Sequence, residues 1–440
     1  MVKKKLSTLQ LVAVLFMVAG WAVALLTMVS GNGKKEQREL VEEAQLLLAE
    51  GLYMPAAELY EQALDDYSTN LNRDLEQELL QIYEDAGKTE EYMDLVEDRI
   101  SDGTATIEEY IRLADIHLNN GSLRGAMAVL KDGVIETEDE AIIKKYESIR
   151  YEHSEREAVY RQVVQAESSL AFPVTDGSKW GYADYRGKQL TGFIFDEATA
   201  FSGDYAVVKQ SGEYQLINAA GDLYGRDTAG LNKVTDLCEE TLAGVKGGKY
   251  ALYTKSFVPV TEHIYDDIIL GEGDRHFVKE AGRWKIVDEE AKEKGDASYE
   301  DVPVNSLGQA FVAKRAVAKD ADGYFVVRSN GKDNFKDGLR YDDAKAIEEE
   351  DGYIAVANSA GKWGFIDEKG ELVIDYKFSD AKSFSCGLAA VKTGAGWSYI
   401  NTYGDVVIRA DYDMANPFRD GSALVQDGGI YKIITLKFYE

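Results

Sequence analysis

The sequence contains little cysteine and little histidine, and both shortages limit the chemistry that the chain can carry. Its 440 residues include only two cysteines, Cys238 and Cys386, which lie far apart at apolar positions typical of strands. Two unrelated buried thiols are therefore expected in place of a disulfide. The histidines do not follow H-E-x-x-H or another metal-ligand spacing, so we predict no metal site. The four histidines are His117, His153, His263 and His276.

The sequence also lacks the motifs that mark common enzyme classes. No Gly-x-Ser-x-Gly, Walker A or dinucleotide-binding fingerprint is present. Asp320, Asp322 and Gly323 resemble part of a calcium loop, but Ala318 stands where the first carboxylate ligand is required. We therefore predict that the protein is not an enzyme, that it needs no cofactor, and that it has no catalytic or metal-binding residue. No motif identifies the residues that bind a ligand.

Positive charge is scarce relative to negative charge. The chain has 49 Lys and Arg residues against 78 Asp and Glu residues, which gives a net charge of -29. Nucleic-acid binding requires a basic face for the phosphates, so we predict no nucleic-acid partner. The simplest interpretation of the acidity is a solvated surface that keeps the protein soluble.

One long uncharged run stands near the start of the chain. It extends from Leu9 to Val29 and follows three lysines at positions 3–5. A helix of this length would span a bilayer core about 30 Å thick. We predict an uncleaved signal anchor over residues 1–35, with a cleaved signal peptide as the alternative. The lysines before the run favour a single-pass protein of the cytoplasmic membrane whose residues 36–440 are extracytoplasmic, although Lys34, Lys35 and Arg38 nearly balance them.

Residues 36–138 have the pattern of repeated helix pairs. Gly51, Gly87 and Gly121 are 36 and 34 residues apart and stand where helix–helix turns are expected. The pattern resembles the tetratricopeptide repeat (TPR), which implies a short α-solenoid with a groove that binds peptides. In the second copy Tyr92 replaces the expected alanine, so the helix packing there is in question. The small residues and the aromatic that would fill the space between helices are Ala44, Ala56, Tyr60, Ala63, Ala114 and Ala126.

Residues 139–169 are predicted to form a charged, tyrosine-rich helix. This helix, drawn from Asp139 to Ser168, would cap the solenoid and lead into the next domain. A solvated linker helix is the alternative interpretation.

From residue 170 to the C-terminus, a unit of 34 to 40 residues recurs. Each copy is anchored on an aromatic residue in a strand with two apolar faces, which indicates packed sheets. Four residues after most anchors an Asp or Asn stops the strand, and seven residues after them a glycine reverses the chain. Four of the anchors are tryptophans, and we predict that Trp363 and Trp397 are core residues and not ligand contacts. The anchors are Trp180, Tyr214, Tyr250, Trp284, Tyr324, Trp363, Trp397 and Tyr431.

The copies resemble the WG-repeat family, named for a Trp-Gly pair that occurs here as Trp180-Gly181 and Trp363-Gly364. The resemblance implies an interaction module without a general enzymatic activity. We predict an all-β repeat domain over residues 170–440, a β-propeller of about seven or eight blades, with an open β-solenoid as the alternative. This domain begins and ends part-way through a repeat, as a ring closed by strands from both ends would. The predicted fold class is therefore multi-domain α + β: an N-terminal transmembrane helix, a short TPR-like α-solenoid and the β-repeat domain.

An aromatic residue followed by an acid recurs in most copies, and we call this pair the aromatic–acid corner. If the repeats close into a ring, the acids could lie at one level and collect cations or a basic ligand. Alternatively, each acid ends a strand by forming an Asx turn. Thr235 and Ser379 interrupt the series, which favours the turn. The acids are Asp196, Asp266, Glu300, Asp342 and Asp413.

Two classes of function remain open. The first is a membrane-anchored, non-catalytic scaffold that binds a protein, a peptide or a cell-envelope polymer through its helical and β-repeat surfaces. The second is a propeller-type glycan hydrolase whose carboxylates come from several blades. The scaffold is favoured because no catalytic constellation is found, and a pocket at the ring centre with two carboxylates about 5 to 9.5 Å apart would support the hydrolase.

Overall fold

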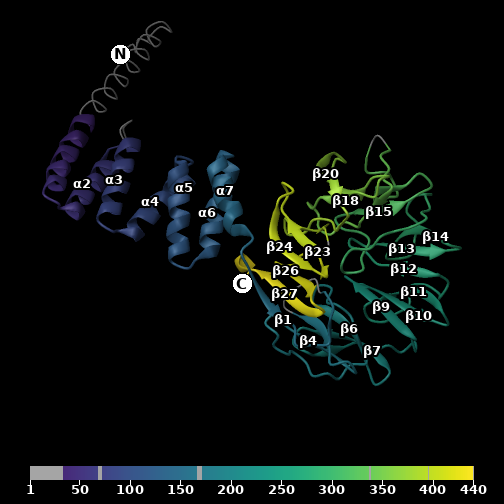
Figure 1. Ribbon diagram of the computed structural model, residues 1–440. Helices are drawn as coiled ribbons and strands as arrows, with labels where there is room; N and C mark the ends of the chain where they lie inside the picture. Colours follow the sequence, from purple (N-terminus) through teal and green to yellow (C-terminus); the bar gives the residue numbers. More distant parts are fainter. Residues whose placement is uncertain (1–32, 68–71, 166–170, 336–337, 395, 440) are drawn as a thin grey trace, which may run out of the picture. The chain divides into compact units, whose positions relative to one another are not determined.

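The computed structural model describes residues 33–67, 72–165, 171–335, 338–394 and 396–439 (Figure 1). The chain divides into two compact units, Met1–Arg150 and Tyr151–Glu440, here called the helical unit and the β unit. The predicted membrane span Leu9–Val29 lies outside the described residues. Among the helices that are described, none combines the length and the apolar character needed to cross a bilayer.

The helical unit consists of successive antiparallel helices joined by short turns. Gly51, Gly87 and Gly121 occupy three of these turns with φ of +76°, +67° and +76°, as predicted from their spacing. A positive φ is readily adopted only by glycine, so these residues let one helix end and the next begin at once. The helices are residues 33–49, α2 (Tyr53–Asp66), α3 (Asn72–Asp85), α4 (Thr89–Ser101), α5 (Ile107–Asn119), α6 (Leu123–Thr137) and α7 (Glu140–Arg150).

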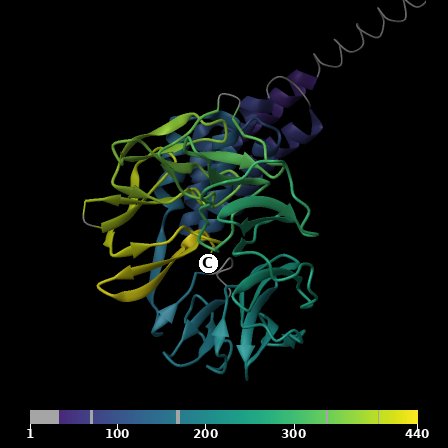
Figure 2. The ribbon, with the colours of Figure 1, turned by 90° about the vertical axis from the view of Figure 1, so that its right-hand side faces the viewer.

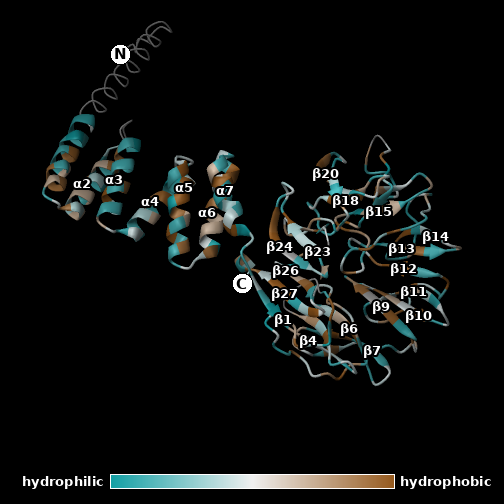
Figure 3. Ribbon diagram, in the orientation of Figure 1, coloured by the Kyte–Doolittle hydropathy of each residue, from teal (hydrophilic) through white to brown (hydrophobic). Residues whose placement is uncertain are grey.

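Small residues at the predicted positions allow these helices to pack closely. Ala44, Ala56 and Ala63 are fully buried and share one hydrophobic cluster with Tyr60. Tyr92 belongs to the same cluster and is also buried, so the second helix pair accommodates a large side chain where alanine was expected. Hydrophobic and hydrophilic residues alternate along each labelled helix, as amphipathic packing requires (Figure 3).

One buried arginine ties three of these helices together. Arg99 on α4 is 2% exposed, and its guanidinium bonds to Glu76 on α3 at 2.5 Å and to Glu109 on α5 at 3.1 Å. Glu109 also completes a capping box with Thr106 at the start of α5. The charges of this buried cluster are therefore paired, as burial in a protein interior requires.

The β unit contains eight small antiparallel sheets among the described residues. In chain order, the first sheet contains β2 (Gln162–Val163), β3 (Phe172–Thr175) and β4 (Trp180–Ala183), and the second contains β5 (Glu197–Ala198), β6 (Tyr205–Gln210), β7 (Glu213–Asn218) and β8 (Leu223–Tyr224). The third sheet contains β9 (Lys233–Cys238), β10 (Thr241–Lys246) and β11 (Lys249–Thr254), and the fourth contains β12 (Asp267–Ile269), β13 (Arg275–Glu280) and β14 (Arg283–Asp288). The fifth sheet contains β15 (Arg315–Lys319) and β16 (Tyr324–Arg328), and the sixth contains β17 (Asp343–Ala344), β18 (Ile354–Ala357), β19 (Trp363–Ile366) and β20 (Leu372–Phe378). The seventh sheet contains β21 (Asp380–Ala381), β22 (Ala389–Thr393), β23 (Gly396–Ile400) and β24 (Val406–Tyr412). The eighth contains β25 (Met414–Ala415), β26 (Ser422–Asp427), β27 (Ile430–Leu436) and β1 (His153–Glu157).

The turn after the anchor strand forms as the sequence predicts. In the sixth sheet, Oδ1 of Asp367 accepts hydrogen bonds from the backbone N–H groups of Lys369 and Glu371, both at 2.9 Å, and Gly370 has φ of +87°. Oδ1 of Asn401 binds the corresponding turn in the seventh sheet. The Asp or Asn stops the strand because its side chain replaces the ladder as the partner of these N–H groups.

The sheets close into a ring, because each packs on the next and the last packs on the first. Eight hydrophobic clusters join consecutive sheets, and the one that joins the first and last sheets contains Phe172, Val174, Leu424 and Ile433. Strand β1 pairs with β27 over the whole of its length. Figure 2 shows the yellow C-terminal strands beside the blue strands that begin the unit. The β unit is thus propeller-like.

Two of the sequence predictions need correction. The predicted fold class included a transmembrane helix, and it named an open β-solenoid as the alternative to a propeller. No described helix can span a membrane, and the described β unit consists of eight separate sheets. An open solenoid would leave the first and last sheets apart, and here they share a core. The helix drawn from Asp139 to Ser168 occupies only Glu140–Arg150, because the residues after it pair as β1 and β2 in the ring.

Candidate functional site

Three of the five acids of the aromatic–acid corner form ion pairs within their own repeats, and a fourth, Asp413, accepts a hydrogen bond from the backbone N–H of Gly429 at 3.1 Å. Asp266 pairs with Lys249 at 2.6 Å, Glu300 pairs with Arg283 at 3.0 Å, and Asp196 pairs with Lys179. All six side chains are more than a third exposed. The lysines hold the pKa values of the Asp196 and Asp266 carboxyls below the ordinary value.

The strand register explains this pairing, and it corrects both interpretations of the corner for these three acids. The anchor Trp180 bridges the corner residue Phe195, which places the neighbours Lys179 and Asp196 opposite each other. Tyr250 and Tyr265 form the same bridge in the third repeat. Asp196, Asp266 and Glu300 therefore neither converge on a common site nor form Asx turns. The basic residue directly before the anchor in each of these three repeats was the sequence signal for their partners.

The remaining sequence candidates are also used for structure. Asp320, from the calcium-like segment, binds the guanidinium of Arg340 at 2.7 Å, and Arg340 also binds Asp333 at 2.8 Å. Among the described residues, no group of three or more His, Cys, Asp or Glu side chains is placed to hold a metal ion.

Each histidine has its own surroundings. His117 lies on α5, and Nδ1 of His153 contacts the carbonyl of Tyr151 at 3.0 Å. Nε2 of His263 contacts the hydroxyl of Tyr253 at 3.2 Å. His276 is 1% exposed on β13, and burial lowers its pKa to about 4. It is therefore a neutral core residue at physiological pH.

The two tryptophans predicted to be core residues differ in their surroundings. Trp363 is 6% exposed and packs in the cluster between the sixth and seventh sheets, as predicted. Trp397 is only half-buried and lines a cavity that the sequence did not indicate. The Nζ atoms of Lys345 and Lys382 lie 4.3 and 5.9 Å from the ring centres of Trp363 and Trp397, respectively.

This cavity, here called the central cavity, has a volume of about 250 Å³. Its lining comes from four segments in four consecutive repeats: residues 303–306, 345–348, 380–382 and 416–417, with Trp397. Ser306 and Arg419 are 113 residues apart in sequence, yet their side chains are in contact at 3.3 Å. In a ring of sheets, repeats that are not neighbours meet only on the inner side, so the cavity lies at the inner rim of the ring.

A buried network of charges forms one wall of the central cavity. The carboxylate of Glu348 pairs with Arg419 at 2.7 Å and accepts hydrogen bonds from the Oγ and backbone N of Ser306 at 2.8 and 3.1 Å. The side chains of Glu348 and Arg419 are 7% and 13% exposed. Glu348 is therefore fixed between two repeats and already satisfied by a cation and two donors.

Two lysines line the same cavity, and they differ in the charge of the group that each one binds. Lys345 pairs with Asp380 at 3.3 Å. Lys382 donates from Nζ to Oδ1 of Asn416 at 3.1 Å, and burial lowers its pKa. The aromatic ring of Trp397 forms part of the apolar wall beside Lys382.

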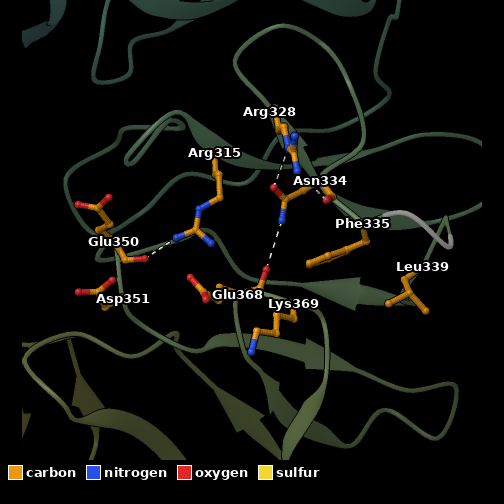
Figure 4. Close-up of a pocket in the computed structure, with 9 residues that line it drawn as sticks. All are labelled: Arg315, Arg328, Asn334, Phe335, Leu339, Glu350, Asp351, Glu368 and Lys369. Carbon is orange, nitrogen blue, oxygen red and sulfur yellow. Dashed lines mark hydrogen bonds between the residues drawn. The ribbon is translucent and has the colours of Figure 1, made fainter.

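A second hollow of about 550 Å³ lies between the fifth and sixth sheets (Figure 4). Arg328 and Asn334 bond to each other at 3.1 Å, Asn334 bonds to the carbonyl of Glu368 at 3.4 Å, and Arg315 bonds to the carbonyl of Glu350. Its polar groups thus largely bind one another and hold three loops together.

The helical unit has a groove of about 450 Å³, here called the acidic groove. It is built by α2, α3 and α4, and the buried Arg99 is the only basic side chain among the described residues that line it. Leu64, Leu79, Leu95 and Tyr83 provide an apolar floor. Its acids are Glu61, Asp65, Glu76, Glu91, Asp94, Asp98 and Asp102.

Comparison with known proteins identifies part of the β unit. A family model described as the WG containing repeat matches residues 180–214, 363–397 and 397–431, and each match begins at a predicted anchor. The chain thus contains WG repeats at three positions. No curated protein matches the chain.

Solved structures show only a distant likeness. Hsv2 of Kluyvelomyces marxianus is 10% identical, with a TM-score of 0.30 over 55% of this chain and 91% of that one. BBS1N in complex with ARL6DN is 12% identical, with a TM-score of 0.31 over 66% and 97%. YCF48 bound to D1 peptide is 8% identical, with a TM-score of 0.31 over 64% and 94%. These scores are too low to support an argument about function.

Proposed function

We propose that the protein is a non-catalytic interaction protein whose helical unit, a TPR-like solenoid, binds a basic segment of a protein partner in the acidic groove. The observation that carries this proposal is the composition of the groove, which seven carboxylates line together with one guanidinium; one of the seven, Glu91, also pairs with Lys88 at 2.9 Å. Arg99 is itself paired with two of the unit's acids, so the groove keeps a strong negative potential. The β unit supplies a second binding surface on the same chain.

The groove suits a partner that is basic and amphipathic. Exposed Asp65, Asp94 and Asp98 surround an apolar floor that includes Leu79 and Leu95. Lysine or arginine side chains would meet the carboxylates, and apolar side chains would cover the leucines. Charge complementarity of this kind accelerates association and excludes acidic partners.

The architecture of the central cavity supports a non-catalytic function over a glycan hydrolase. A hydrolase of that type needs one carboxyl group that donates a proton and a second that acts as base or nucleophile. The two acids of the central cavity are Glu348 and Asp380, and each is held by a cation at 2.7 and 3.3 Å. Both carboxylates are therefore occupied by cations of the protein, and neither is presented to a substrate as a free acid or base.

An extracytoplasmic location of the two units is also a proposal. It rests on the lysine-flanked run Leu9–Val29 in the sequence. Protease added to intact spheroplasts should digest both units, and protection until lysis would reverse the proposed location. A cell-envelope polymer is the alternative ligand in that setting.

The binding proposal is tested with two labelled peptides and the full-length protein. One peptide alternates lysine and leucine, and its matched partner alternates glutamate and leucine. Fluorescence anisotropy should show saturable binding of the basic peptide alone, which weakens as salt is raised. The triple variant Asp65→Asn, Asp94→Asn, Asp98→Asn should lose about tenfold in affinity, since each exposed charge contributes a fraction of a kcal/mol.

A matched control separates the groove from the general acidity of the chain. Asp132, Glu136 and Glu140 are exposed acids on α6 and α7 of the same unit and lie outside the groove. Their neutralisation changes the net charge equally. Equal losses in the two triple variants, or equal binding of the acidic peptide, would show that the groove is not the binding site.

A further inference from the structure

The central cavity is lined by four charged side chains, and one of them has no charged partner among the described residues. Glu348 is neutralised by its arginine, and Lys345 by Asp380. Lys382 forms no ion pair within that part of the chain, and its ammonium donates to Asn416, which is a neutral acceptor. The cavity therefore retains one positive charge.

A second donor in the cavity wall is also without a partner. Asn305 is 5% exposed, and its Oδ1 accepts hydrogen bonds from the backbone N–H groups of Leu307 and Gln309, both at 3.0 Å. Its Nδ2 has no hydrogen-bond partner among the described residues. A buried side-chain amide whose oxygen accepts hydrogen bonds while its nitrogen has no acceptor is uncommon in folded proteins. The unpaired Nδ2 therefore points to a missing acceptor.

Part of the wall is apolar. Trp397 stands beside Lys382, and Pro303, Val304 and Pro417 complete this side of the cavity. A ligand that fits here needs an acceptor group with one negative charge and a small apolar body.

We propose that the central cavity binds a small organic monocarboxylate, whose oxygens accept hydrogen bonds from Nζ of Lys382 and Nδ2 of Asn305 while its apolar part lies against Trp397. This site lies in the β unit, and the proposal is independent of peptide binding by the acidic groove. Because burial lowers the pKa of Lys382, an anion at its Nζ would restore the preference for the charged form.

The charge of the site argues for a monoanion. A phosphate ester or a dicarboxylate would bring a second negative charge close to Glu348 and Asp380, and only Lys382 is available to offset it. Glu348 and Asp380 are already paired with cations, and the described residues contain no cluster that could hold a metal ion. The ammonium of Lys382 is therefore the cationic group that a ligand would have to match.

The proposal is tested by comparing carboxylates with their isosteric amides on the full-length protein. Propionate and benzoate should raise the melting temperature of the β unit and change tryptophan fluorescence saturably. Propionamide and benzamide, which lack the charge, should not. Lys382→Met should weaken carboxylate binding by roughly tenfold to a hundredfold, as expected for a lost charged hydrogen bond. Asn305→Ala should weaken it by less.

Lys369→Met serves as the matched control, because Lys369 is an exposed lysine in the hollow of Figure 4. It should bind both carboxylates like the parent protein. Circular dichroism confirms that each variant is folded, and Lys382→Arg should bind better than Lys382→Met because it keeps the charge. Carboxylates that bind no better than amides, or an undiminished affinity in folded Lys382→Met, would overturn the proposal.

A carboxylate can reach this cavity as a free metabolite or as the C-terminus of a polypeptide. A short peptide with a free C-terminus is therefore compared with the same peptide amidated. Tighter binding of the free C-terminus than of propionate would identify a polypeptide as the source, and the reverse order would identify a small molecule.

Discussion

The acidic groove and the central cavity differ in how their charged side chains are stabilised. In the groove, exposed carboxylates of like sign gather around one buried arginine, and most of them depend on water for stabilisation. In the cavity, Asp380 pairs with Lys345, and Glu348 is enclosed by partners from two other repeats. The difference shows that a helical solenoid can leave a face of one sign open to solvent, whereas at the inner rim of the ring two ion pairs match the charges of the cavity except that of Lys382.

The same contrast applies to how the two units build their cores. The first helices of the helical unit share one continuous cluster, which extends from Ala44 to Ile116. The β unit divides its core into separate clusters between consecutive sheets, each of which depends on an aromatic anchor or corner. Damage to one anchor should therefore affect the ring strongly without reaching the helices.

The largest expected effect tests this independence. Trp363→Ala removes a side chain that is 6% exposed, and it should lower the free energy of unfolding of the β unit by roughly 3–5 kcal/mol. The described tryptophans all lie in the β unit, so their fluorescence reports its transition, while circular dichroism at the helical band reports the other unit. A loss of ligand binding at unchanged stability would instead make Trp363 a contact residue.

A pH titration should distinguish the units next. His276 has a pKa of about 4 in the fold against an ordinary value of 6.5, because burial disfavours its charged form and Arg275 adds repulsion. Below pH 6.5 the unfolded chain binds a proton that the folded chain does not. Stability is therefore full above pH 6.5 and falls by about 3 kcal/mol as the pH drops toward 4.

The measurement is the urea midpoint of the β unit between pH 7 and pH 4. His276→Gln removes the titrating group and should flatten this dependence, whatever its effect on stability at pH 7. A slope that is equally steep in this variant would assign the acid sensitivity to other groups.

A smaller effect is expected at the rim of the central cavity. Ser306→Ala removes a hydroxyl that donates to the Glu348 carboxylate at 2.8 Å, and it should lower the stability of the β unit by about 2 kcal/mol. Ser148→Ala is the matched change in the helical unit, where the hydroxyl is exposed and bonds only to the carbonyl of Lys145. Equal and small losses in chemical denaturation would show that the Glu348 network is not enclosed.

The smallest effect should have the opposite sign. Asp94 and Asp98 lie four residues apart on α4, where like charges repel. Asp98→Asn should raise the stability of the helical unit by roughly 0.2–0.5 kcal/mol at low salt, and the gain should vanish at high salt. A gain that persists in high salt would have another origin than charge repulsion.

Much of the local structure could be predicted from the sequence, because it depends on neighbours in the chain. The turn glycines, the Asx turns after the anchors and the buried Trp363 all follow from spacing and residue type. The central cavity could not be predicted, since Ser306, Glu348 and Arg419 are far apart in sequence and none belongs to the repeated pattern. The end of α7 was also missed, because β1 is charged and exposed and becomes a strand only through its pairing with β27.

That last pairing has a consequence for how the protein is made and how it bears load. Strand β1 is at the start of the β unit, but its partner β27 includes residues 430–436, so the ring cannot be closed until these residues have left the ribosome. Contacts of such long sequence separation form slowly. Only two residues, Tyr151 and Glu152, separate β1 from α7, so tension applied through the helical unit reaches this latch first. Force from that side would therefore peel off β1 before any repeat, and ring opening would begin at the seam where folding ended.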